Sequence, residues 1–263
     1  LVLRLDGYFT CGEIAIKPQY KHAWVFSDGL ASVDDNGMIK FIDSKGNVVI
    51  DLNIPYITGA EGYVFHNGHC VIHNNKRDKF GLIDKKGNWM LKAEYDAILP
   101  KDSFFVVNKG GMQSVLTENL KQILPFMEAD LWISGNSITA TMKDHTLRKY
   151  NLQGELIDDF LISNVDRLLY DTDEIRYTTA KNYDDEGNLT GETAEAEPTP
   201  YQKTANCKKY EADIGWYGLM SPSGKVITPP RYCDITAIGY DLYLCKTDDI
   251  RGEVLNGKGV RVR

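Results

Sequence analysis

Residues 41–50 read FIDSKGNVVI, and the same arrangement returns as LIDKKGNWML at 82–91 and as LMSPSGKVIT at 219–228. Each stretch has two mainly apolar residues, a short polar residue, two further polar residues, a glycine and a second apolar segment. Internal repeats are the first feature to look for, because an overlooked repeat leads to the wrong fold. The three stretches therefore indicate a chain built from copies of one small repeat.

The frame recurs along the whole chain when its glycine is taken as an anchor. The steps between successive anchors run from 32 to 41 residues and centre near 35. A period that persists from one end to the other predicts seven to eight repeats stacked on one another. The anchor positions are Gly12, Gly46, Gly87, Asn119, Gly154, Gly187, Gly224 and Gly259.

A polar residue three positions before most anchors completes a turn signature. Asp, Asn and Ser side chains accept hydrogen bonds from backbone amides two residues later, and glycine tolerates a positive φ. Together they predict a tight hairpin turn. The second residue after the anchor, as at Val48, Trp89 and Leu156, is expected on the buried face of the returning strand. The predicted turn pairs are Asp43 with Gly46, Asp84 with Gly87, Asn151 with Gly154, Ser221 with Gly224, and Asn256 with Gly259.

The fold class follows from these repeats. Each is expected to hold about three antiparallel strands, and no convincing amphipathic helix interrupts them. We therefore predict a single all-β repeat domain over residues 1–263. Stacked repeats bury their faces either in a propeller-like ring or in an open β-solenoid. The ring is favoured because closure removes exposed strand edges, and the irregular steps keep the solenoid as the alternative.

The best-preserved repeats resemble a known family. FGLIDKKGNWMLKAEYDAI at 80–98, YGLMSPSGKVITPPRYCDI at 217–235 and FSDGLASV at 26–33 are similar to the WG-repeat β module common in bacterial proteins. Phe80 and Tyr217 stand where that family has Trp. The resemblance implies a β-repeat scaffold and implies no catalytic residues.

Composition excludes some partners. The net charge of -7 argues against nucleic acid, whose backbone attracts clustered Lys and Arg. No apolar stretch is long enough to span a bilayer, and the first residues lack the apolar core of a signal peptide. Five scattered cysteines without a C-x-x-C pair favour a reducing compartment. We expect a cytoplasmic location, with the periplasm or cell envelope as the alternative if a leader was removed.

The segment 171–213 departs from the repeats. It carries eleven acidic and five basic residues, and this excess accounts for nearly all of the chain's net charge. Such a segment buries little apolar surface, which predicts a long polar hairpin or a solvated loop projecting from the repeats. Its tyrosines make it capable of binding a partner. The candidate binding residues are Tyr177, Tyr183, Asp184, Asp185, Glu186 and Tyr201.

Three of the five histidines crowd into FHNGHCVIH, residues 65–73. Aligned with the repeat at 26–34, the stretch becomes a strand in which Cys70 faces the core. Strand alternation then sends His69 and His73 to the opposite, outer face. They would lie about 13 Å apart along the strand, too far to share one metal ion, so we predict surface histidines, no metal site and no cofactor.

No catalytic motif is present, and the paired carboxylates fall in turns or at solvated positions. The four tryptophans are expected to pack in the core or between repeats. We therefore predict a non-catalytic recognition or scaffold module, with a protein partner that has a basic surface. A cell-envelope or glycan-binding module, with exposed Trp rings, is the first alternative. A hydrolase built from two carboxylates is the second. The sequence does not indicate an oligomeric state.

Overall fold

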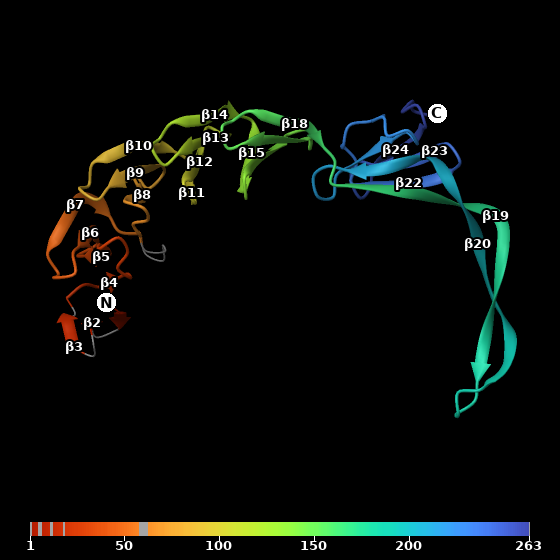
Figure 1. Ribbon diagram of the computed structural model, residues 1–263, viewed down its shortest axis with the longest axis horizontal. Coiled ribbons are helices and arrows are strands. Elements are labelled where there is room, and N and C mark those ends of the chain that lie inside the picture. The colour runs from red at the N-terminus through yellow and green to blue at the C-terminus, as the bar shows by residue number, and fades with distance from the viewer. Residues whose placement is uncertain (1, 5–6, 11–12, 18, 58–62, 263) are drawn as a thin grey trace. The chain divides into compact units, whose positions relative to one another are not determined.

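The computed structural model describes residues 2–4, 7–10, 13–17, 19–57 and 63–262, with the backbone alone at 2–15, 176–180 and 193–198. Every regular element in these residues is a β-strand, which confirms the all-β fold class (Figure 1). Nothing in them forms a helix of the length and hydropathy that a membrane span requires. The chain divides into a first half, Leu1–Glu128, and a second half, Ala129–Arg263. A single domain over 1–263 stays a prediction.

Four antiparallel sheets make up the described part of the first half, each with its strands side by side in chain order. The sheets comprise β1 Val2–Arg4, β2 Gly7–Thr10 and β3 Glu13–Ile16; β4 His22–Ala23, β5 Ala31–Asp35, β6 Met38–Ile42 and β7 Val48–Pro55; β8 His69–His73, β9 Phe80–Asp84 and β10 Trp89–Tyr95; and β11 Ala97–Lys101, β12 Phe104–Lys109, β13 Met112–Thr117 and β14 Gln122–Met127. Each sheet is therefore one repeat of three or four strands.

The second half continues the same pattern with three sheets in its described residues. They comprise β15 Ala129–Ser134, β16 Ser137–Met142, β17 Leu147–Asn151 and β18 Leu156–Leu161; β19 Asn164–Tyr183, β20 Leu189–Glu211 and β21 Tyr217–Met220; and β22 Asp234–Gly239, β23 Leu242–Lys246 and β24 Gly252–Asn256. All neighbouring strands are antiparallel. The repeat array that the sequence predicts is present in both halves.

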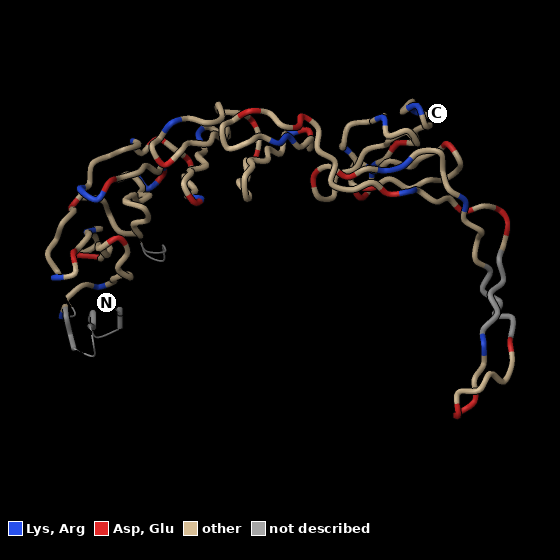
Figure 2. The backbone as a smooth tube through the Cα atoms, in the orientation of Figure 1, with Lys and Arg blue, Asp and Glu red and all other residues tan. Residues whose placement is uncertain are grey.

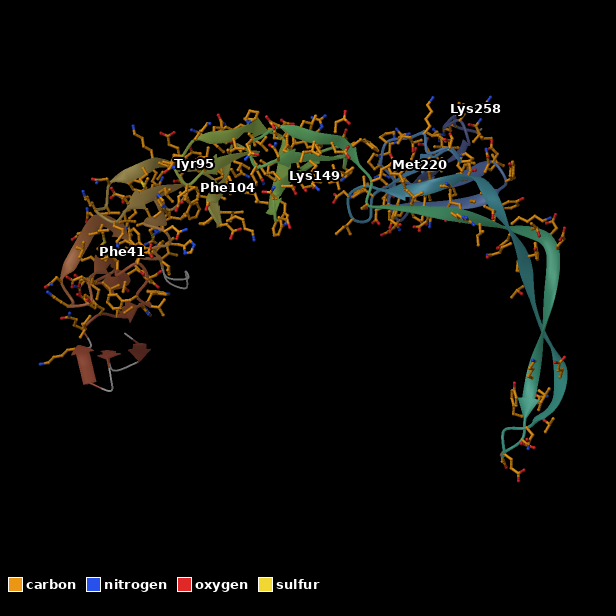
Figure 3. All side chains as sticks on the ribbon, in the orientation of Figure 1. Phe41, Tyr95, Phe104, Lys149, Met220 and Lys258 are labelled. Carbon is orange, nitrogen blue, oxygen red and sulfur yellow. The ribbon has the colours of Figure 1, made fainter. Side chains whose placement is uncertain are left out.

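The hydrophobic core lies between consecutive sheets. Phe41 of β6 packs edge-on against Phe65, with ring centroids 5.1 Å apart, in the core between the β4–β7 and β8–β10 sheets (Figure 3). Its neighbour Ile42 points the other way, into a core shared with Ile16 of β3. Because both faces of the sheet are covered, adjacent residues of one strand are both buried. This explains apolar pairs such as Phe41-Ile42 in the repeated frame.

The turns of the frame have the predicted chemistry. The Asp43 carboxylate accepts hydrogen bonds from the amides of Lys45 and Asn47, both at 2.9 Å, and Gly46 has a φ of 83°. The same acceptor role falls to Asp84, Asn151, Ser221 and Asn256. The matching glycines, Gly87, Gly154, Gly224 and Gly259, all have positive φ. Gly12 lies outside the described residues.

The position two residues after the anchor is exposed in four repeats, contrary to the prediction, whereas Val226 is partly buried and packs against the core of its repeat. Val48 and Leu156 are exposed, and the buried residue in the first case is Ile50. Pairing shifts directly after the turn, since Ile42 faces Val48 but Phe41 faces Ile50. This β-bulge adds one residue to the returning strand and so exchanges its two faces.

The predicted fourth anchor, Asn119, lies one residue before the residue that closes the turn. The turn there is closed by a hydrogen bond from the Leu120 amide to the Thr117 carbonyl, and Leu120, not Asn119, has a positive φ of 62°. A further turn of this type, unseen in the sequence, runs from Met142 to Thr146 with His145 at a φ of 63°. Non-glycine residues in the left-handed region leave no recognisable signature.

Candidate functional site

The segment 171–213 is an antiparallel hairpin that belongs to the second half. β19 and β20 pair from Asn164 and Glu211 at the base to Tyr183 and Leu189 beside the turn. At the base, Leu168, Ala205 and Cys207 lie in the core shared with β21–β24. Beyond Asp171 the two strands extend away from that core (Figure 1). We call residues 171–203 the distal hairpin.

The turn at the tip is built like the other repeat turns. The Asp184 carboxylate accepts the amides of Asn188 at 2.7 Å and Glu186 at 3.1 Å, and Gly187 has a φ of 81°. These bonds, the one from the Asn188 backbone first, hold the pKa of Asp184 below its usual value. The carboxylate is therefore charged at neutral pH. The side chains of Asp185 and Glu186 are exposed beside it.

Charge is concentrated in the distal hairpin, which carries nine acidic and three basic residues. Figure 2 shows acidic positions at the tip and along the strands. An ion pair of 3.1 Å between Lys203 and Glu174 offsets part of this charge, and the Gln202 side-chain amide donates a hydrogen bond of 2.9 Å to Asp171. Five further carboxylates are exposed and can attract a cationic surface, those of Asp173, Asp184, Asp185, Glu186 and Glu192.

The predicted binding residues do not form one cluster. Tyr183, Asp184, Asp185 and Glu186 come together at the tip, and the Tyr183 side chain is 60% exposed. Tyr201 lies near the core end of the distal hairpin, where its carbonyl accepts the Thr172 hydroxyl at 2.7 Å. The Tyr177 side chain lies outside the described residues.

Sequence reasoning missed two exposed apolar residues on this hairpin. Leu189, which pairs with Tyr183, is 54% exposed, and Ile175, which pairs with Pro200, is exposed as well. The only available signal was their isolation, because they are the only Val, Ile, Leu, Met or Phe residues between 171 and 213. The tip is thus a mixed surface of an aromatic ring, an aliphatic side chain and carboxylates.

The first half contains a pocket of about 550 Å³ around the histidine stretch. His66, His69 and His73 line it together with Tyr63, Phe80 and Phe105. The expected exposure of His73 is wrong, because this residue is 0% exposed. His69 is half-buried, with its ring edge-on to Phe105 at 5.7 Å between centroids. Cys70 is buried, as expected.

Strand alternation holds in β8, but both of its faces are covered. β8 lies between two other parts of the half, so that Ile72 packs in the core with Phe41 while Tyr63 covers the His73 ring edge-on at 5.6 Å. Within the described residues, no three His, Cys, Asp or Glu side chains are placed to hold one metal ion.

The tryptophans are distributed unevenly. Trp24 packs against the first-half core, and Trp216 stacks on His145 with centroids 3.6 Å apart. Trp89 is partly exposed, and Trp132 of β15 is 68% exposed. The expectation that all four would pack in the core or between repeats is wrong for Trp132.

Three stretches of the chain match a known repeat family. The model of the WG containing repeat matches residues 12–38, 80–112 and 217–249. The chain thus has three segments that match the WG repeat, in agreement with the resemblance seen in its sequence. Two of them contain the frame copies at 82–91 and 219–228 and the glycines that follow Phe80 and Tyr217, whereas the copy at 41–50 lies outside the matched segments. No curated protein sequence matches the chain.

Solved structures resemble the chain only distantly. The designed Ika8 protein has a TM-score of 0.32 and 16% identity, over 91% of this chain and 84% of its own. BamB from Moraxella catarrhalis has a TM-score of 0.32 and 11% identity, over 95% and 75%. Hsv2p from Kluyveromyces lactis has a TM-score of 0.31 and 9% identity, over 87% and 71%. Likenesses this weak say nothing about what the chain binds.

Proposed function

We propose that this chain is a non-catalytic recognition module whose distal hairpin binds a protein partner with a basic surface. The WG repeats supply the scaffold, and the hairpin supplies the contact. The observation that carries the proposal is the tip, where Tyr183 and Leu189 are 60% and 54% exposed beside a turn of three acidic residues.

A two-stranded hairpin without a core beneath it is only marginally stable in water. The distal hairpin has this form, because in its described residues beyond Asp171 β19 pairs only with β20. Covering Tyr183 and Leu189 with a partner would remove their apolar surface from water, at about 25 cal/mol per Å². Exposed aromatic and aliphatic side chains at a projecting tip are thus better explained by binding than by folding.

The acidic excess defines the chemistry of the partner. A net negative hairpin accelerates encounter with a positive surface and repels a negative one. Tyr183 and Leu189 then provide short-range contact once the partner has arrived. We expect the affinity to weaken as salt rises, because exposed charges are screened over about 8 Å at physiological ionic strength.

The test compares the proteins that the intact chain and a shortened chain retain from extracts of the native host. In the shortened chain, Asp171 is joined to Gln202 through an Asn-Gly turn, since these residues face each other across the hairpin and Asn-Gly favours two-residue turns. The packed base of the hairpin stays intact. The proposal expects a protein that only the intact chain retains, and it fails if both chains retain the same proteins in equal amounts.

Point variants sharpen this test. Leu189 and Leu156 both stand two residues after a turn glycine, and they are 54% and 53% exposed. Leu189→Ser should weaken partner retention, whereas Leu156→Ser, a matched change elsewhere in the second half, should leave it unchanged. Equal effects of both variants would contradict a role for the tip.

Glycan binding is a second candidate, favoured by one observation. Trp132 is 68% exposed on β15, and exposed tryptophan rings can stack on sugar rings. The candidate expects soluble oligosaccharides to change the fluorescence of the wild-type chain but not of Trp132→Ala. If no member of a broad oligosaccharide panel does so, the candidate is excluded.

A further inference from the structure

The pocket of the first half has the dimensions of a small-molecule site. Its volume of about 550 Å³ lies within the range of about 300–1,000 Å³ that is typical of ligand pockets. Much of its wall is apolar, formed by Val71 and Leu82 of β8 and β9 and by Ile98 and Phe105 of β11 and β12. It lies in a different half from the distal hairpin, and neither site contributes to the other.

The His73 ring places an unused acceptor in this wall. Its Nδ1 atom lies 2.6 Å from the Asn74 carbonyl oxygen. A carbonyl only accepts, so Nδ1 is the donor, which selects the tautomer with its hydrogen on Nδ1. The Nε2 atom is then an acceptor. It is buried and has no hydrogen-bond partner among the described residues.

Tyr63 adds a second buried polar atom to the same wall. Its hydroxyl also has no partner in the described part of the chain. Burial raises the pKa of Tyr63 to about 12, so the hydroxyl keeps its proton at neutral pH and can donate it. The Tyr63 and His73 rings meet edge to face, with centroids 5.6 Å apart. Leaving such groups unpaired destabilises the folded chain, because each has given up its hydrogen bond to water.

One chemical group can pair with both the His73 acceptor and the Tyr63 donor. A hydroxyl can donate its hydrogen to His73 Nε2 and accept the Tyr63 O–H at its oxygen. We propose that the pocket binds a small, mainly apolar molecule that carries a hydroxyl group, of the substituted-phenol class. The apolar part lies against Leu82, Ile98 and Phe105, and the hydroxyl satisfies Tyr63 and His73. No carboxylate or ammonium is required of the ligand.

The experiment uses the full chain and two probes of similar shape, p-cresol and 4-fluorotoluene, with binding measured by titration in NMR spectra. Only p-cresol can donate a hydrogen bond. We expect it to bind at least tenfold more tightly, a ratio that corresponds to about 1.4 kcal/mol. The preference should fall toward unity in His73→Phe and in Tyr63→Phe. His22→Phe, the same change outside the pocket, should leave it intact.

Three results would overturn the proposal. They are absence of p-cresol binding up to about 10 mM, equal affinity of the wild-type chain for both probes, and a preference that survives in both pocket variants. The first two need no variant, so a poorly folding His73→Phe does not spare the proposal. Because the distal hairpin takes no part, the hairpin-shortened chain should bind p-cresol as the intact chain does.

Discussion

Gly87, in the turn of one repeat, packs against Ile50 of the preceding repeat so closely that a Cβ atom on Gly87 would lie 2.8 Å from the Ile50 Cγ2 atom. Ile50 stands four residues after its own turn glycine, Gly46. Gly259 meets Ile227 in the same way at 2.9 Å, and Ile227 stands three residues after Gly224. Gly87 and Gly259 therefore do more than permit a positive φ, because they also let successive repeats approach.

This contact predicts different costs for two equivalent substitutions. Gly87→Ala adds a Cβ both to a positive φ of 82° and to the Ile50 contact, whereas Gly224→Ala, at a φ of 90°, meets nothing within 4 Å. The left-handed conformation costs about 1–2 kcal/mol, and overpacking adds about 1–3 kcal/mol. We expect Gly87→Ala to lower the urea midpoint clearly more than Gly224→Ala. Equal midpoints would show that the repeats do not meet there.

The glycine after the aromatic residue of the frame is required for a different reason. A Cβ on Gly218 would lie 2.5 Å from the ring of Tyr210. That ring is fully buried, and its hydroxyl donates to the Thr228 carbonyl at 2.6 Å, so it cannot move aside. Gly218→Ala should destabilise the second half by about 3 kcal/mol.

Gly191→Ala is the matched control for Gly218→Ala, since neither glycine has a positive φ and a Cβ on Gly191 meets nothing within 4 Å. It should be neutral or stabilise slightly, because alanine restricts the unfolded chain. Thermal unfolding compares the two variants. A Gly218→Ala chain as stable as Gly191→Ala would remove the packing explanation.

Acid should weaken the turns. Hydrogen bonds from Asn47, and likewise from Asn88, hold the pKa values of Asp43 and Asp84 below the ordinary 3.8. A lowered folded-state pKa contributes stability above the unfolded value, and this contribution is lost as pH falls through the folded value. We expect the free energy of unfolding to fall below about pH 4, as measured by urea titration at pH 6 and at pH 2.5.

The double variant Asp43→Asn, Asp84→Asn isolates this effect. Asparagine keeps the acceptor oxygen, as Asn151 and Asn256 show in their own turns, but it does not titrate. The variant should lose less stability than the wild-type chain between the two pH values. Identical losses would mean that other groups cause the acid sensitivity.

The cysteines should differ in reactivity. Burial raises the pKa of Cys70 and of Cys245 to about 12 and raises the pKa of Cys207, so few thiolates form there at neutral pH. Cys233 is only half-buried. Brief alkylation with iodoacetamide, mapped by mass spectrometry, should label Cys233 before Cys70, Cys207 and Cys245, and should label all five cysteines in denaturant. Labelling of Cys70 as fast as Cys233 in the folded chain would contradict the packing of β8.

The sequence was sufficient to predict structure where that structure depends on interactions between neighbouring residues. Asp43 and Gly46 specify a turn through bonds within five residues, so the repeat could be read from single positions. Prediction from the sequence failed where one inserted residue exchanges the two faces of a strand. The bulge after the Asp43 turn exchanges the faces of the returning strand, so that Val48 is exposed and Ile50 is buried. No side chain in the frame indicates that shift of register.

Packing between residues far apart in the chain could not be predicted from the sequence either. His73 was expected on the outer face of β8, yet Tyr63 covers that face and creates the pocket wall. The hairpin could be foreseen because composition alone separates residues 171–213 from the repeats. The exposure of Leu189 could not, since its place after Gly187 indicated a buried strand position.

The salt dependence of partner binding tests the central claim most directly. The affinity of the retained protein is measured at about 50 and 300 mM salt for the wild-type chain and for Asp185→Asn, Glu186→Gln, which leaves the Asp184 turn intact. We predict weaker binding by the variant at low salt and a smaller loss of affinity at high salt. The same affinity and the same salt dependence for both chains would contradict the assignment of the distal hairpin as an acidic binding site.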